Sequence, residues 1–461
     1  MQSRKNLFAK IGQIALCTGF LACAGSALGH SAKEKTLYQF QGGSDGWYPL
    51  ASMIADNAGN LYGTTLEGGT IGSCEGQGDG CGTVFQLKPP SQRGGGWTHS
   101  VIYTFLGSDG AAPQDPLITD GQGNLYGATE EGGLTDGCPT GGCGVVFRLT
   151  PPTKKGGAWT ETVLHYFKGV PSGNGVGDAA EPNNIVFGSD GNLYGMAYIG
   201  GDCATGEGGT VCSGAVFELE RPANPSGTWK EKLLYIFNVR SGTGSPNNAF
   251  FDKFGNLDGT VGGGAFGFGE VFSLTPTTHG AWTLTSLHDF TGAPDGAFPN
   301  QGLAFDAAGN VYGTTLAGGD NEPGDGTVYE LQPPAQQGGA WTESVLFTFI
   351  GATTGYLPEN GPIMDSAGNL YGNTASGGGS DFGLIFKLTP QQGGEWSEST
   401  LYSFPGGSGG EAPNALNFGK LGAIFGTSSW VGQMGTASAE CLPAALFLVS
   451  RLEAPLTKIT N

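Results

Sequence analysis

The stretch GNLYGTT at residues 59–65 returns six more times along the chain. The later copies are GNLYGAT at 123–129, GNLYGMA at 191–197, GNLDGTV at 255–261, GNVYGTT at 309–315, GNLYGNT at 368–374 and GAIFGTS at 422–428. Successive copies start about 54 to 68 residues apart. A fixed period of this size, in a sequence of short strand-like runs, is typical of a β-propeller.

One repeat unit reads as four strands. In the fifth unit, residues 302–306 form a short apolar run and 311–315 are rich in aromatic and β-branched residues. Residues 326–331 and 341–349 then alternate between apolar and polar side chains. We name these four strands A, B, C and D in chain order, and they predict one four-stranded blade.

The strand count predicts a closed ring of seven blades. Strands A, B and C occur seven times after residue 49, whereas strand D, led by Trp, occurs six times. Residues 36–40 match the missing copy, so we expect the N-terminal strand to pair with residues 445–449 and remove a sheet edge. We expect one propeller over residues 30–461, with blades near 50–106, 116–168, 184–238, 247–291, 301–350, 361–405, and 414–449 plus 36–40.

The first 29 residues have the pattern of a secretory signal peptide. Arg4, Lys5 and Lys10 precede the apolar run 11–24, and residues 27–29 give a cleavage site. Cys23 offers the alternative of a lipid anchor. No later stretch is apolar enough to span a membrane. We therefore expect a secreted, periplasmic or cell-surface protein.

Three close cysteine pairs agree with export. They are Cys74 with Cys81, Cys138 with Cys143, and Cys203 with Cys212, each in the B–C loop of successive repeats. Local disulfide bonds are the simplest interpretation in an oxidising compartment. Cys441 has no nearby partner and is expected to be free.

The acidic balance of the chain argues against nucleic acid as a partner. The chain has 40 Asp and Glu against 20 Lys and Arg, a net charge of -20. Nucleic acids and anionic membranes would be repelled by such a surface.

The ordered phrases of the repeat resemble the GloVer tandem repeats of bacterial secreted and surface proteins described as having a "choice of anchor". The matching phrases are GTVFxL, GGxWTExxLYxF, DGxxPxxGL and DxxGNLYGTT, which follow one another over roughly residues 36–450. The fourth unit departs from the pattern with Asp258 in place of Tyr. The resemblance implies a surface or secreted location and a repeat fold, and it implies no defined activity.

The candidate binding face carries the B–C and D–A loops. The B–C loops vary most in length and hold most of the acids, and variable loops on a rigid scaffold are common binding sites. Two tryptophans outside the Trp register and three loop acids are the candidate ligand-binding residues: Trp47, Trp430, Glu67, Glu130 and Glu131. We expect a glycan or an envelope protein as partner and no catalytic residue; a polysaccharide-acting enzyme and a purely structural module remain the alternatives.

Other residues receive structural interpretations. Asp56, Asp120, Asp252, Asp306 and Asp365 each precede a tight turn and are expected to cap it. His165 and His288 stand where other D strands carry an aromatic ring, and they are expected to replace that ring in packing. No cofactor and no metal site is expected. Zinc at the cysteine pairs is disfavoured by their irregular spacing, and calcium is the alternative cation, although no single loop has the spacing of a calcium loop.

Overall fold

A computed structural model describes residues 33–450 except for several loop segments. The segments outside the description are 70–73, 75–79, 93, 136–137, 139–140, 170–177, 201–202, 207–208, 225–226, 239–244, 321–323, 337, 420–421 and 433–444. The predicted signal peptide, Cys23 and Cys441 lie outside the described residues.

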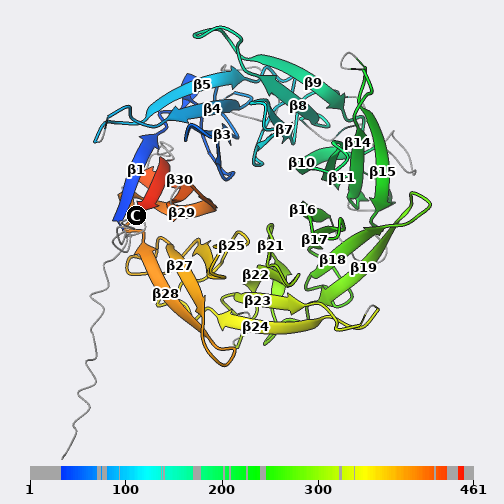
Figure 1. Ribbon diagram of the computed structural model, residues 1–461, viewed down its shortest axis with the longest axis vertical. Coiled ribbons are helices and arrows are strands. Elements are labelled where there is room, and N and C mark those ends of the chain that lie inside the picture. Colours follow the sequence, from blue (N-terminus) through cyan, green and yellow to red (C-terminus); the bar gives the residue numbers. More distant parts are fainter. Residues whose placement is uncertain are drawn as a thin grey trace, which may run out of the picture. The chain divides into compact units, whose positions relative to one another are not determined.

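The described chain folds into antiparallel sheets that succeed one another around a common axis, with A strands innermost and D strands outermost (Figure 1). The first three repeats form one sheet each. Their strands are β2 (Ile54–Ala55), β3 (Leu61–Thr65), β4 (Thr83–Lys88) and β5 (Thr98–Thr104); β6 (Ile118–Thr119), β7 (Leu125–Thr129), β8 (Val145–Thr150) and β9 (Thr160–Tyr166); and β10 (Ala180–Phe187), β11 (Leu193–Ile199), β14 (Ala215–Glu220) and β15 (Lys230–Ile236).

The later repeats continue the same order. Their strands are β16 (Pro246–Phe251), β17 (Leu257–Val261), β18 (Glu270–Pro276) and β19 (Trp282–Asp289); β20 (Ala297–Pro299), β21 (Ala304–Phe305), β22 (Val311–Ala317), β23 (Thr327–Gln332) and β24 (Thr342–Thr348); and β25 (Ile363–Met364), β26 (Leu370–Thr374), β27 (Leu384–Pro390) and β28 (Trp396–Ser403). A further sheet has the order β1 (Lys33–Gln39), β31 (Ala445–Ser450), β30 (Ile424–Gly432) and β29 (Gly407–Phe418).

The prediction of an all-β propeller with four-stranded antiparallel blades is confirmed, but the prediction of uniform blades needs correction. Six sheets have four strands, whereas the sheet of the fifth repeat has five. There the strand nearest the axis is divided into β20 and β21, which both pair with β22. Outside these sheets lie the hairpin β12 (Cys203–Gly206) with β13 (Gly209–Cys212) and the short 3-10 helix η1 (Gly43–Asp45).

The repeated phrase folds as it does because its aspartate organises the A–B turn, as predicted. Asp56 accepts hydrogen bonds from the backbone N–H groups of Ala58 and Asn60, at 2.8 and 2.9 Å. Its second oxygen accepts from the Asn60 amide at 2.7 Å and from the Tyr62 hydroxyl at 3.1 Å. Gly59 takes φ 86°, which a residue with a side chain adopts only at a cost. The bonds to the backbone and to the Asn amide recur at Asp120, Asp252, Asp306 and Asp365. The tyrosine bond recurs at all of these except Asp252, whose repeat carries Asp258 in place of Tyr.

The other letters of the phrase shape the core between blades. A Cβ atom on Gly63 would lie 2.6 Å from the Phe85 ring of strand β4, so only glycine allows that ring to lie across strand β3. Tyr62 packs edge-on against Trp159 of the next sheet, with ring centroids 6.0 Å apart. Trp97, Trp282 and Trp396, which lead other D strands, make similar ring contacts with a neighbouring sheet.

Two of the three predicted disulfide bonds are present. Cys74 is bonded to Cys81 and Cys138 to Cys143. Cys203 and Cys212 lie directly opposite each other in the β12–β13 ladder, and their bond stays a prediction. In the described part of the chain, no helix has the length and apolar character needed to cross a bilayer.

Candidate functional site

A cavity of about 580 Å³ lies where the A strands meet, and it is lined by residues of the six four-stranded sheets and of the segment between β20 and β21. This volume is in the range typical of small-molecule sites. Its walls include several amide side chains that directly follow a proline or lie one residue further on, namely Gln114, Asn183, Asn184, Asn248, Asn360 and Asn414. Apolar side chains such as Leu117, Phe250 and Leu416 line it as well, so the wall is a mixture of amide, acidic and apolar groups.

Part of this amide set is fixed by hydrogen bonds to the next sheet. The Asn184 amide donates to the Ala249 carbonyl at 3.2 Å, and the Asn414 amide donates to the Pro49 carbonyl at 3.2 Å. These bonds hold the carboxamide planes in place. The Oδ1 atoms of Asn183 and Asn248 are buried and have no hydrogen-bond partner in the described structure. Buried acceptors are normally satisfied, so these two oxygens are exceptions, and a ligand in the cavity reaches them only if the side chains turn.

Carboxylates add further acceptors to the same cavity. Asp115, Glu130, Glu181 and Glu359 contribute to its lining. Burial raises the pKa of Asp115 to about 7, and burial together with the charges of Glu130 and Glu131 raises the pKa of Glu181 to about 7. Burial, and then Glu131, also raises the pKa of Glu130. No ion pair with Lys or Arg involves these acids within the described residues.

The structure brings some of the sequence-predicted residues together and separates others. Glu130 lines the cavity, and Gln114 donates a hydrogen bond to its carboxylate. Glu131 is half-buried close by, and its charge acts on both Glu130 and Glu181. Two of the five predicted residues are thus part of one acidic group.

Trp47 and Glu67 form a separate pair away from the cavity lining. Their backbones bridge each other, with Trp47 N donating to Glu67 O at 2.8 Å and Glu67 N donating to Trp47 O at 3.1 Å. The half-buried Trp47 ring stacks on Tyr48, with centroids 5.5 Å apart. The Trp47 Nε1 atom is buried without a hydrogen-bond partner in the described structure.

Trp430 does not lie in a B–C loop, which corrects the sequence prediction. Its backbone belongs to strand β30 and lies opposite Glu411 of strand β29. The strand extends further than the repeat predicts because the long partner β29 continues its pairing past the phrase GAIFGTS.

Sequence reasoning missed Glu181, Asp115 and the half-exposed Tyr198, which also lines the cavity. The sequence does contain a feature that marks these residues, which is a proline between strands D and A of the repeats. The residue before that proline has positive φ in five repeats, at Tyr48, Ala112, Glu181, Phe298 and Leu357. Residues with side chains rarely adopt this conformation, and strained positions of this kind are common around binding sites.

His165 and His288 pack as the sequence predicts, and each makes a further contact. His165 and His288 do stack edge-on against Phe167 and Phe290, as packing rings would. They also face acids, however, which the sequence interpretation did not include. His165 with Asp178 and Glu231 is the one group in the described structure whose side chains could jointly hold a metal ion.

Comparison with known proteins identifies the family. The Gloeobacter/Verrucomicrobia repeat matches residues 28–206 and 203–438. The chain belongs to this repeat family. The predicted resemblance is thereby confirmed, and no curated protein matches the chain.

Solved structures resemble this repeat protein at low identity. The extracellular domain of a protein described as a hybrid two-component system from B. thetaiotaomicron is 11% identical with a TM-score of 0.50, covering 93% of this chain and 45% of that one. A PL25 ulvan lyase is 11% identical with a TM-score of 0.47, covering 87% and 90%. A luciferin-regenerating enzyme is 11% identical with a TM-score of 0.42, covering 91% and 96%. Such likeness concerns the fold alone.

Proposed function

We propose that this repeat protein is an exported, non-enzymatic binding module that takes part of a glycan into the cavity where the A strands meet. The observation that carries the proposal is the composition of the cavity wall. It combines the amide side chains of Asn183 and Asn248 and the carboxyl groups of Asp115, Glu130 and Glu181 with apolar side chains such as Phe250. A wall of this mixed kind suits a sugar, whose hydroxyl or amino groups donate hydrogen bonds and whose C–H faces pack on apolar groups.

The same wall limits the kind of glycan. Above about pH 7, where Asp115 and Glu181 are mainly ionised, carboxylates without cationic partners repel uronate and sulfate groups and attract an ammonium group. We therefore expect neutral or amino-bearing sugars rather than acidic ones. Trp47, Glu67, Glu131 and Trp430 are proposed for the part of the ligand that extends beyond the cavity, where an aromatic ring can stack on a sugar.

We also propose that the propeller counts seven blades, with the five-stranded sheet as one of them, and that β1 closes it. The pairing of β1 with β31 supports this, because strands from both ends of the described chain then share one sheet. Export is supported by the signal-like leader and by the two disulfide bonds, which are typical of oxidising compartments.

A polysaccharide-acting enzyme is the second candidate, favoured by one observation. Carboxyl groups whose pKa is raised to about 7, as at Asp115 and Glu181, are suited to donate a proton near neutral pH. An enzyme would release shorter products from a bound oligosaccharide, whereas a binding module would leave it intact.

The proposal is tested with an array of neutral, amino-bearing and uronate-bearing oligosaccharides, followed by calorimetry and product analysis. We expect binding without turnover, and roughly tenfold weaker binding in Glu181→Gln and Asn248→Ala, since each removes one acceptor. Glu398→Gln alters an acid of the outer strand β28 and should leave binding unchanged.

Other outcomes identify the alternatives. Release of shorter products would contradict the binding module and support the polysaccharide-acting enzyme. Binding of an envelope protein that is insensitive to Glu181→Gln but lost in Trp47→Ala would move the site from the cavity to the loops. Failure of every oligosaccharide to bind would overturn the glycan proposal.

A further inference from the structure

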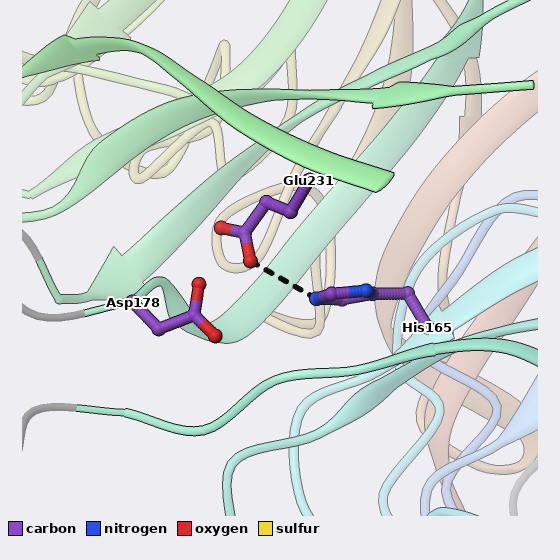
Figure 2. A group of neighbouring side chains, drawn as sticks. All are labelled: His165, Asp178 and Glu231. Atoms are coloured by element: carbon purple, nitrogen blue, oxygen red, sulfur yellow. Dashed lines mark hydrogen bonds and ion pairs between the residues drawn. The ribbon is translucent and has the colours of Figure 1, made fainter. Parts of the chain in front are cut away.

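Three side chains from separate segments meet between the second and third sheets (Figure 2). His165 comes from strand β9, Asp178 from the loop that leads to β10, and Glu231 from strand β15 of the next sheet. One ligand-type atom of each residue lies within 4.8 Å of the other two. The His165 Nε2 atom is 3.0 Å from the Glu231 Oε2 atom.

The group is poorly hydrated. The side chains of His165 and Glu231 are only 14% and 8% exposed. Burial, and then the neighbouring Glu231, raises the pKa of Asp178 to about 7. Burial lowers the pKa of His165, so its imidazole is neutral at neutral pH and keeps a lone pair.

Two adjoining carboxyl groups repel each other when both are ionised, and a proton or a cation relieves that repulsion. No lysine or arginine within the described residues forms an ion pair with Asp178 or Glu231. Lys168 is exposed and acts on Glu231 only through its charge at longer range. The Ala179 N–H donates to Asp178 Oδ1 at 3.2 Å and to Glu231 Oε1 at 3.4 Å. A metal ion at this group would therefore take the place of the proton that the two carboxyl groups share near neutral pH.

The other repeats show what is different at this position. In the corresponding places the Tyr38 hydroxyl donates to Asp45 at 2.7 Å, and the Tyr103 hydroxyl donates to Asp109 at 2.5 Å. A tyrosine hydroxyl satisfies the loop aspartate and offers no metal ligand at neutral pH. His165 stands in that place and supplies a nitrogen instead.

A second histidine set provides an internal comparison. His288 faces Asp295 at 3.1 Å, but Asp295 also accepts from the Thr291 N–H at 2.9 Å and the Thr291 hydroxyl at 3.0 Å. Its aspartate is therefore already satisfied by the protein. Glu343 acts on Asp295 and His288 only through its charge, and the ligand atoms of these three residues do not come within 4.8 Å of one another as those of the first group do.

We propose that His165, Asp178 and Glu231 bind one Zn²⁺ ion that joins the second and third sheets. One imidazole nitrogen and two carboxylate oxygens form a donor set suited to zinc, whereas calcium and magnesium prefer oxygen ligands alone. Zinc–ligand bonds of about 2.0 Å in tetrahedral geometry place ligand atoms roughly 3.3 Å apart. The 3.0 Å contact between His165 and Glu231 is close to that value, so Asp178 needs the main adjustment.

The test uses the full mature chain without a histidine tag, stripped of metal with a chelator. Calorimetry with Zn²⁺ and metal analysis after dialysis should show one bound ion, and thermal melting should shift upward on binding. Zinc should also displace protons from the carboxyl groups, which calorimetry in buffers of different ionisation enthalpy measures. Calcium should give no binding at this group.

Variants locate the ion. His165→Tyr restores the residue that other repeats carry and keeps the packing ring, so it should fold and lose zinc binding; Glu231→Gln should lose it too. The matched control variants His288→Tyr and Glu343→Gln should keep one zinc ion. Absence of zinc binding in the wild-type chain, or an ion retained in both His165→Tyr and Glu231→Gln, would overturn the proposal, as would loss of the ion in His288→Tyr.

Discussion

The aspartate of the A–B turn contributes to stability through its ionised form. Burial alone would raise the pKa of Asp365, but the hydrogen bonds from Asn369, Tyr371 and the Ala367 N–H outweigh burial and lower it below the ordinary value of 3.8. A lowered folded-state pKa means that the stabilisation is present above pH 3.8 and is lost as pH falls through the folded-state pKa.

We therefore expect Asp365→Ala to lower the free energy of unfolding by about 1 kcal/mol at pH 7, because solvent screening limits the value at this half-exposed turn. The difference from wild type should shrink below pH 3.8. Urea denaturation at several pH values measures it. Asp320→Ala, at an exposed loop acid, is the control and should change the free energy of unfolding little. An equal decrease in both variants would contradict the capping role of Asp365.

The buried acid of the cavity has the opposite pH dependence. Burial raises the pKa of Asp115 from 3.8 to about 7. Between these two pH values the folded chain binds more protons than the unfolded chain, so the free energy of unfolding falls as pH rises through this window.

Asp115→Asn removes that titration and leaves an acceptor for the Asn184 N–H. We expect it to stabilise the protein by on the order of 1–3 kcal/mol at pH 8, less than the full shift implies because cavity water screens the charge. The gain should vanish near pH 4, as thermal melting across this range would show. A difference in stability between Asp115→Asn and the wild type that stays constant at all pH values would contradict the raised pKa of Asp115.

At the scale of elements, the repeated phrase and the aspartate before it predicted the β-strands because several of these residues have a local structural function. Asp56 caps the turn, Gly59 takes positive φ, and Gly63 leaves room for Phe85. The metal-binding group could not be predicted in the same way. His165 and Glu231 lie 66 residues apart, and only the register between two sheets brings them together. The positions of the Asn183 and Asn248 side chains at the cavity could not be predicted either, because they depend on the contacts between neighbouring sheets.

The hairpin β12–β13 makes a prediction about its two cysteines. Cys203 and Cys212 occupy opposite positions in an antiparallel ladder, which is a spacing that a disulfide bond can span. We expect this bond in the exported protein, contributing about 2–3 kcal/mol. Mass spectrometry of unreduced proteolytic peptides decides it. A bond from either residue to Cys441 would contradict the prediction.

At the scale of the whole molecule, the first and last sheets share one apolar cluster. Leu37 and Phe40 pack with Phe85 of the first sheet and with Phe425 and Leu446 of the C-terminal strands. Phe40 is fully buried, with its ring 5.3 Å from that of Phe85. The N-terminal segment therefore contacts elements from both ends of the described chain, and the backbone of β31 would be left at a sheet edge without it.

Removal of this segment tests whether β1 closes the propeller. Phe40→Ala should lower the free energy of unfolding by about 3–5 kcal/mol, because it leaves a cavity in that cluster. Gln39→Ala, at an exposed position of the same strand, should change it by less than about 0.5 kcal/mol.

Deletion of residues 33–40 should lower the melting temperature further and promote association through the edge of β31, measured by light scattering. A circular permutant that carries residues 33–41 after residue 450 should melt like the wild type, since it restores the same pairing. If the deletion variant melts like the wild type and stays monomeric, β1 does not close the ring.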